Sequence, residues 1–333
     1  MTNSPSTPEP SLRERFVGCL LGGAIGDALG APVEFLSWRE IERRFGPNGI
    51  RTFASAYGGT GRITDDTQMT LFTAEGLIRA EHRVADRGLV SVDAVLHRAY
   101  LRWLYTQVRD SRDVPWDPEI GEDISGWLIK QEFLHSRRAP GTTCMGALFS
   151  GKTGTPEKPL NDSKGCGGVM RVAPVGLVAT DPFDLGCRAA AITHGHPSGW
   201  LASGAFAQII AAVIRSDSIR TAVEAALERC RSEDGGAEVI RALEATLALV
   251  DEGKAPTPER VELLGGAGSP RRHWRSRSTA RSAPRAQPTP WLTRSTTLGT
   301  ATAQGRSPAT SWVQRSAWIG WTSHCSVSWR HVR

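Results

Sequence analysis

The chain has 333 residues, of which 40% are hydrophobic and 22% are charged, a composition typical of a soluble globular protein with a buried core. It contains no run of 18 or more apolar residues, so we expect no membrane-spanning segment, and its first residues lack the pattern of a secretory signal. The six cysteines are scattered without a C-x-x-C pair, which argues against a zinc ribbon or a disulfide framework and favours a cytoplasmic protein.

The net charge of +6 is distributed unevenly along the chain. Residues 265–333 contain eleven Arg and six of the eleven Trp, but no Lys, Asp or Glu. The remaining 29 basic and 34 acidic side chains lie in residues 1–264, which therefore carry a net charge of −5. We accordingly divide the chain into a Pro/Ser/Thr-rich segment at 1–11, expected to be disordered, an acidic domain at 12–264 and a basic tail at 265–333.

Apolar residues in the acidic domain recur at helical spacing from Leu12 onwards. The first predicted helix contains many glycines, each costing about 1 kcal/mol relative to alanine, which indicates tight packing against neighbours, and Pro32 should end it near Ala31. A second helix should begin near Thr64 or Asp65. Further helices are predicted at 91–107, 168–180, 185–194, 200–215, 218–231 and 236–251. Since no stretch alternates long enough to require a strand, the predicted fold is a compact all-α domain.

The segment GGAIGDALGAPVEF, residues 22–35, carries two candidate acids. Its glycines resemble those of a phosphate-binding loop, but no strand precedes them and no G-K-[ST] follows, so that interpretation is weak. Asp27 and Glu34 are seven residues apart and would share one helix face only if the helix continued past Pro32. The alternative is that the glycines serve packing and that both acids are solvated.

The segment GRITDDTQMT, residues 61–70, places three oxygen-bearing side chains, Thr64, Asp65 and Asp66, at a predicted helix start. Hydroxyl and carboxylate oxygens are the ligands that Mg²⁺ and Mn²⁺ prefer, with water completing the coordination shell. Thr and Asp at this position also serve as ordinary helix caps and as partners of the helix dipole. These residues alone leave both interpretations open.

A third segment, NDSKGCGGVMRVAPVGL at 161–177, combines polar residues and glycines before an apolar helix. Backbone N–H groups of such a loop can hold a phosphate, although an ordinary glycine loop has the same composition.

A fourth segment, THGHP at 193–197, places His194 and His196 two residues apart after a predicted helix. This spacing fits neither one helix face nor a standard zinc motif. The two histidines therefore either contact a ligand or cap a helix.

Taken in order, these four segments and RAPGTTC at 138–144 resemble the motifs of the ADP-ribosylglycohydrolase family over about residues 12–264. The resemblance implies a compact all-α fold with two Mg²⁺ or Mn²⁺ ions at the base of an ADP-ribose cleft. It implies hydrolysis at C1″ of the distal ribose, in an ADP-ribosylated protein or a small-molecule ADP-ribose conjugate. Metal ions would polarise ribose hydroxyls and orient water, while a carboxylate manages the proton near an oxocarbenium-like centre.

The resemblance also assigns roles to individual residues. It implies metal ligands at Thr64, Asp65 and Asp66, and catalytic carboxylates at Glu34, Asp65 and Asp66. It implies contacts to ADP-ribose along the third and fourth segments, at Asn161, Ser163, Gly165, Gly167, His194 and His196. It leaves open whether the acceptor is arginine, serine or another group, and which of Glu34, Asp27 and Asp113 acts as acid or base. We expect a monomer without a membrane or nucleic-acid partner.

The basic tail departs from the family pattern, which places the second half of the metal site near the C-terminus as an Asp-x-Asp-type motif. Residues 265–333 contain no carboxylate. A nucleic-acid-binding tail, a disordered linker and translation in the wrong frame each account for an Arg-rich composition. Codons compatible with residues 268–285 and 295–312, read one nucleotide earlier, give a helix-forming sequence and N-H-P-G-H-S-D-S, a degenerate form of the missing motif.

We therefore expect a frameshift near Gly266, either as a mutation or as an error in the sequence. The chain as translated would lack half of its metal ligands together with core helices, and it would expose an apolar face. Three functions remain. The first is a metal-dependent hydrolase of ADP-ribosyl linkages, whose activity this translated form has in part or wholly lost, and the second is a non-catalytic pseudo-enzyme that binds ADP-ribose. The third is a nucleic-acid binder that uses the basic tail, although the altered frame already explains the excess of Arg.

Overall fold

The computed structural model describes residues 9–116, 118, 121–253 and 257, which form an all-α domain, as predicted. Its helices are α1 (Leu12–Gly30), α2 (Trp38–Phe45), α3 (Asp65–Arg87), α4 (Val92–Gln107), α5 (Thr142–Phe149), α6 (Ala173–Val178), α7 (Pro182–Ala191), α8 (Pro197–Ile214), α9 (Ile219–Arg231) and α10 (Ala237–Asp251). The only sheet within the described residues is a short hairpin of two strands with two residues each, β1 (Ser55–Ala56) and β2 (Gly59–Thr60). The basic tail and the predicted frameshift near Gly266 lie outside the described residues.

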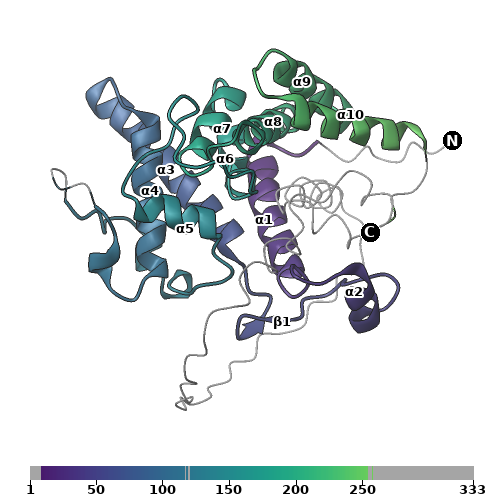
Figure 1. Cartoon of the computed structure of the whole chain (residues 1–333), viewed down its shortest axis with the longest axis horizontal. Coiled ribbons are helices and arrows are strands. Elements are labelled where there is room, and N and C mark those ends of the chain that lie inside the picture. The colour runs from purple at the N-terminus through teal and green to yellow at the C-terminus, as the bar shows by residue number, and fades with distance from the viewer. Residues whose placement is uncertain (1–8, 117, 119–120, 254–256, 258–333) are drawn as a thin grey trace.

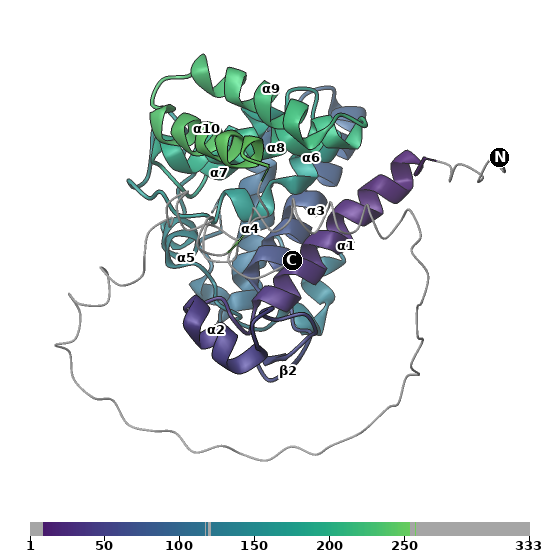
Figure 2. The same ribbon diagram turned by 90° about the vertical axis from the view of Figure 1, so that its right-hand side faces the viewer.

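The helices form a bundle in which α8 is central (Figure 1). It packs against α6, α7 and α9, while α3 packs against α4 on the other side of the bundle. Figure 2 shows α1 crossing one side of this bundle, with α2 and the β-hairpin at the end opposite α9 and α10. Ser11 begins α1 with a capping box: its hydroxyl accepts the N–H of Glu14, whose carboxylate accepts the N–H of Ser11 at 2.8 Å.

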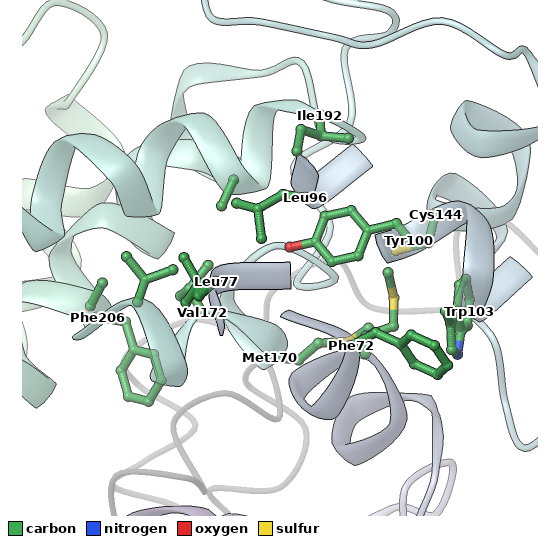
Figure 3. Packing of buried hydrophobic residues seen from close by; sticks show 14 of the residues in the cluster. Phe72, Leu77, Leu96, Tyr100, Trp103, Cys144, Met170, Val172, Ile192 and Phe206 are labelled. Atoms are coloured by element: carbon green, nitrogen blue, oxygen red, sulfur yellow. The ribbon is translucent and has the colours of Figure 1, made fainter. Parts of the chain in front are cut away.

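The main hydrophobic core lies between α3, α4 and the segments around α5 and α6 (Figure 3). Phe72 of α3 and the aromatic side chains Tyr100 and Trp103 of α4 are fully buried there. The indole N–H of Trp103 donates to Gln68 at 3.1 Å, so this polar atom does not lose a hydrogen bond on burial. Each side chain of this size contributes about 1.5–3 kcal/mol on burial, which fixes the N-terminal half of α3 firmly in the bundle.

Most glycines of α1 are buried, as the predicted tight packing requires, whereas Gly23 has open space beside its Cα. Gly18, Gly22 and Gly26 are buried at intervals of four residues and lie on one helix face. The side chains of Val17 and Leu21 are 47% and 55% exposed on the opposite side. We call Val17 and Leu21 the α1 apolar face.

The predicted helix at 168–180 is wrong in its first half. Val169–Arg171 form a 3-10 turn, and α6 begins only at Ala173. Pro174 has no N–H, and its ring blocks the carbonyl four residues earlier, so a continuous α-helix cannot run through it. The helices predicted from 185 and 200 begin three residues earlier, at Pro182 and Pro197, because proline is well suited to the first helical position.

Within the described residues, α8 is the one helix whose length and mean hydropathy of 1.4 would allow it to cross a membrane. Of this helix, 67% is buried inside the protein, against α6, α7 and α9. It therefore occupies the position of a core helix.

Candidate functional site

Asp27 of α1 holds the first turn of α3 in place. Its carboxylate accepts hydrogen bonds from the N–H (2.8 Å) and hydroxyl (2.7 Å) of Thr64, and further bonds from the N–H and hydroxyl of Thr67. Thr64 in turn caps α3 by accepting the N–H of Asp66 at 3.3 Å. Asp27 is only 2% exposed, so the interpretation of this residue as a solvated acid is wrong: it anchors the acidic motif to α1.

Asp65 is buried beneath the RAPGTTC segment. Its backbone N–H donates to the carbonyl of Arg138 at 3.0 Å, and its carboxylate accepts the N–H of Gly141 at 3.0 Å. Burial raises the pKa of Asp65 well above its usual range, and neighbouring carboxylates, chiefly Asp66, raise it further. The Gly141 N–H opposes this shift because it stabilises the charged form.

Asp66 lines a small cavity between α1 and α3, together with Asp27, Thr67 and Met170. The volume of this cavity is about 30 Å³, which is the space of about one water molecule. A single water or ion fits beside Asp66, whereas a nucleotide does not.

Glu34 lies in the turn after α1, because that helix ends at Gly30, as Pro32 predicts. Tyr57, at the tip of the β1–β2 hairpin, lies close enough to Glu34 for that carboxylate to raise the pKa of the phenol. Burial raises the pKa of Tyr57, and the charges of Glu34, Asp65 and Asp27 raise it further. Glu34 therefore belongs to one group with the acids at the start of α3, and we call Asp27, Glu34, Asp65 and Asp66 the acidic cluster.

We define residues 161–168 as the glycine loop. Asn161 joins this loop to the THGHP segment through hydrogen bonds of its side chain. Its side-chain oxygen accepts the N–H of Ser163 at 3.0 Å and of Gly195 at 3.2 Å. Its amide nitrogen donates to the carbonyl of Thr193 at 2.8 Å. These three bonds give Asn161 a role in the shape of the loop.

The first turn of α5 connects the glycine loop to the acidic cluster. Gly141 donates its N–H to Asp65, and two residues later the hydroxyl of Thr143 lies 3.0 Å from the hydroxyl of Ser163. Ser163 also accepts the N–H of Gly165 at 3.2 Å. Segments far apart in the sequence thus meet at one place, which no local sequence pattern predicts.

His194 lies directly against the glycine loop. A Cβ at Gly165 would be 3.2 Å from its Nε2, and a Cβ at Gly167 would be 2.7 Å from its Cε1, so only glycine leaves room at position 167. The ring is 2% exposed, and its Nδ1 lies 2.9 Å from the hydroxyl of Thr193. Burial and then the charge of Arg171 lower the pKa of His194 to about 3, so the imidazole is neutral near pH 7.

His196 has a different environment from His194. It is the N-cap of α8, and its Nδ1 accepts the N–H of Ser198 at 3.0 Å. Its Nε2 lies 4.0 Å from Asp162 of the glycine loop. Of the two roles left open by the sequence, His196 serves as a cap, whereas His194 contacts the loop.

The oxygen donors of Thr64, Asp65 and Asp66 are of the kind that a hard divalent cation binds. The Thr64 hydroxyl donates to Asp27, and the Asp65 carboxylate accepts from Gly141, so these oxygens already have protein partners. Within the described ranges, no group of three or more His, Cys, Asp or Glu side chains could hold a metal ion. The donor types therefore fit a cation, but these residues supply only part of a coordination shell.

Two members of the site, Tyr57 and Thr143, were not predicted from the sequence. Thr143 lies inside RAPGTTC, a segment already singled out, so its helix-start position was an available signal. The Gly58–Gly59 pair predicts a turn after Tyr57, but no local pattern indicates that this turn reaches Glu34.

Comparison with known proteins gives one family. The sequence model of the ADP-ribosylglycohydrolase family matches residues 8–286. An uncharacterised protein of Archaeoglobus fulgidus is 30% identical over 233 residues, which cover 67% of this chain and 63% of that protein. The ADP-ribosyl-[dinitrogen reductase] glycohydrolase of Rhodospirillum rubrum is 30% identical over 200 residues, covering 56% of this chain and 54% of the relative.

Among solved structures, an ADP-ribosylglycohydrolase-related protein complex matches with a TM-score of 0.46 and 26% sequence identity. The match covers 70% of this chain and 67% of the other. The chain spans 63% and 54% of the length of the two curated relatives.

Proposed function

The chain belongs to the ADP-ribosylglycohydrolase family, a family of hydrolases that act on ADP-ribosyl linkages, and we propose that its site binds the ADP-ribosyl group of a modified side chain or small molecule. In this proposal, the bond cleaved is the one at C1″ of the distal ribose. The observation that carries the proposal is the contact of α5 with both halves of the site, through Gly141 to Asp65 and through Thr143 to Ser163.

The glycine loop supplies the binding half of the site. Its backbone comes close to the His194 ring only because positions 165 and 167 have no Cβ. Loop N–H groups and a neutral imidazole can donate hydrogen bonds to phosphate or ribose oxygens without adding a charge to the site. We therefore assign Ser163, Gly165, Gly167 and His194 to the ligand, and Asn161 and His196 to the shape of the loop.

The acidic cluster supplies the reactive half. Glu34 is a carboxylate in the turn after α1, beside Tyr57, and in this position it would accept a proton from the attacking water or return one to the leaving group. Thr64, Asp65 and Asp66 would hold a Mg²⁺ or Mn²⁺ ion, which when bound polarises ribose hydroxyls. Asp113 has no part in this proposal, because it lies exposed in a 3-10 turn.

The proposal includes a frameshift near Gly266 that removes the second half of the metal site. The absence of any Asp or Glu from 265–333 and the exposed α1 apolar face both support it. We further propose a cytoplasmic monomer, which the free thiols of Cys19, Cys144, Cys187 and Cys230 support, since free thiols are typical of a reducing compartment.

The test uses the purified full chain, with Mn²⁺ or Mg²⁺ present. Binding of ADP-ribose is followed by calorimetry, and release of ADP-ribose from arginine-linked and serine-linked peptides is followed by chromatography. Ser163→Ala should weaken ADP-ribose binding about tenfold, because it removes a hydroxyl that we assign to the ligand. Ser232→Ala should leave binding unchanged, because Ser232 is exposed and its hydroxyl donates to the carbonyl of Arg229.

The two candidate functions differ in whether ADP-ribose is released from the peptides. Turnover of either peptide establishes a hydrolase, and binding without turnover establishes a pseudo-enzyme that retains the ADP-ribose site. Absence of binding in the wild-type chain, with the fold intact by circular dichroism, would overturn both.

A further inference from the structure

Arg171 is a fully buried guanidinium with no carboxylate partner among the described residues. Its Nη2 donates to the carbonyl of Ala189 at 2.9 Å and to the hydroxyl of Thr193 at 2.8 Å. The guanidinium carbon lies 4.2 Å from the centroid of the Tyr100 ring, which helps to offset the lost hydration. Burying a charge is costly, so a cation retained here without a counter-charge calls for a specific role.

Thr193 connects Arg171 to His194. The Thr193 oxygen accepts from Arg171, and it lies 2.9 Å from Nδ1 of the imidazole. A guanidinium can only donate hydrogen bonds, so the hydroxyl proton of Thr193 cannot point at Arg171. Among the hydrogen bonds of the described residues, Nδ1 is the acceptor that this proton can reach, and donation to Nδ1 leaves no hydroxyl donor without a partner. A neutral imidazole whose Nδ1 accepts a hydrogen bond carries its proton on Nε2.

The Nε2 side of the ring faces the glycine loop. A Cβ at Gly165 would lie 3.2 Å from Nε2, and one at Gly167 would lie 3.1 Å from it. His194 is 2% exposed as a residue, and its Nε2 has no hydrogen-bond partner in the part of the chain that the structure describes. An N–H without a protein acceptor, held at a loop of glycines by a residue that is 2% exposed, points to an acceptor on a ligand.

We propose that Arg171 and Thr193 are positioning residues that fix His194 as the Nε2–H tautomer, so that its N–H donates to an oxygen of the ligand in the glycine loop. The relay itself stands on the contacts of Arg171, Thr193 and His194, and only the identity of the ligand as ADP-ribose rests on the proposed function. The same arrangement keeps a positive charge off the imidazole, because Arg171 lies one hydroxyl away from it.

The tautomer can be observed directly in the full chain labelled with ¹⁵N-histidine. Long-range ¹H–¹⁵N correlation spectra distinguish a protonated Nε2 from a protonated Nδ1. We expect the Nε2–H pattern for His194 at pH 7. Thr193→Val, which keeps the shape but removes the hydroxyl, should give a mixture of tautomers, whereas Thr193→Ser should restore the wild-type pattern. An Nδ1–H pattern in the wild type, or a wild-type pattern in Thr193→Val, would overturn the relay.

Addition of ADP-ribose separates this proposal from the proposed function. We expect ADP-ribose to shift the Nε2 resonance of His194 and to bind Thr193→Val about tenfold more weakly than Thr193→Ser. The resonance of His196, the α8 cap, should not respond to Thr193→Val and serves as the internal control. If the tautomer is as expected but ADP-ribose leaves His194 unchanged, the relay stands and the assignment of the ligand is wrong. The Thr193→Ser variant also shows whether a loss in Thr193→Val comes from misfolding.

Discussion

Asp27 accepts hydrogen bonds from both the backbone N–H and the hydroxyl of Thr64, across 37 positions of sequence. One buried carboxylate of α1 thus satisfies donors that the start of α3 would otherwise leave without partners. The position of the whole acidic motif depends on this contact.

We expect Asp27→Asn to destabilise the protein by about 2–4 kcal/mol. The carboxylate accepts hydrogen bonds on two oxygens, whereas the amide has a single oxygen, and its NH₂ group would face the donors of Thr64 and Thr67. Urea denaturation measures the change. Asp113→Asn is the matched control, since Asp113 is exposed in a 3-10 turn, and its effect should stay within about 0.5 kcal/mol. Equal effects of the two substitutions would contradict the role given to Asp27.

Two buried histidines should make the protein sensitive to acid. Burial, followed by the charge of a nearby arginine, lowers the pKa of His194 to about 3 and that of His97 to about 4. An unfolded histidine has a pKa near about 6.5, so the unfolded chain binds more protons below that pH. The free energy of unfolding is therefore unaffected by these histidines above about pH 6.5. Below that pH it falls, by up to about 1.4 kcal/mol per pH unit for each histidine that stays neutral in the folded protein.

Denaturation at pH 7, 6 and 5 measures this slope. His194→Gln should reduce the slope, because it removes one of the two buried groups that take up a proton on unfolding. His82→Gln, at an exposed position of α3, should leave the slope as it is in the wild type. A slope that His194→Gln does not change would show that this histidine is already protonated in the folded protein.

Gly167 should not tolerate a side chain. An added Cβ would lie 2.5 Å from the Cys144 sulfur and 2.7 Å from Cε1 of His194, so the glycine loop would have to move. We expect Gly167→Ala to abolish the ADP-ribose response of His194 and to cost about 1–3 kcal/mol of stability. Gly146→Ala, on α5 with no atom within 4 Å of the added Cβ, should be neutral or stabilising by up to about 1 kcal/mol. Thermal unfolding and ADP-ribose titration of both variants make the comparison.

The frameshift proposal makes a prediction about α1. Val17 and Leu21 are half-exposed in this chain, so Val17→Lys combined with Leu21→Lys should change its stability by less than about 0.5 kcal/mol and should reduce self-association. In a chain whose reading frame is restored after Gly266, covering helices would bury both positions, and the same pair should destabilise it by several kcal/mol. Equal effects in the two chains would contradict the proposal that the altered frame removed helices that pack on the α1 apolar face.

Sequencing of genomic DNA from about codon 255 to 50 codons beyond Arg333 tests the frame itself. A single inserted or deleted base, with the N-H-P-G-H-S-D-S reading restored, is the expected result. If the genomic sequence encodes residues 265–333 as given, the gene itself has lost the second half of the metal site. The hydrolase function would then be withdrawn in favour of the ADP-ribose-binding pseudo-enzyme.

Local signals were enough to locate the helix ends around the site. Thr64 begins α3 and Pro32 prevents α1 from continuing, as predicted, because caps and proline effects act within about four residues of chain. At 168–180, apolar periodicity predicts one helix, but Pro174 is suited to a helix start, so α6 begins only at Ala173.

The sequence by itself determined the order of the motifs, the all-α class and the chemistry of the side chains at each motif. Only the tertiary structure decided which of them meet: Asp65 with Gly141 across 76 positions, and Thr143 with Ser163 across 20. It also separated His194, which lies against the glycine loop, from His196, which caps α8. The physical reason is that helix starts and turns depend on hydrogen bonds between near neighbours, whereas a site is made by the packing of α1, α3 and α5, which no local pattern encodes.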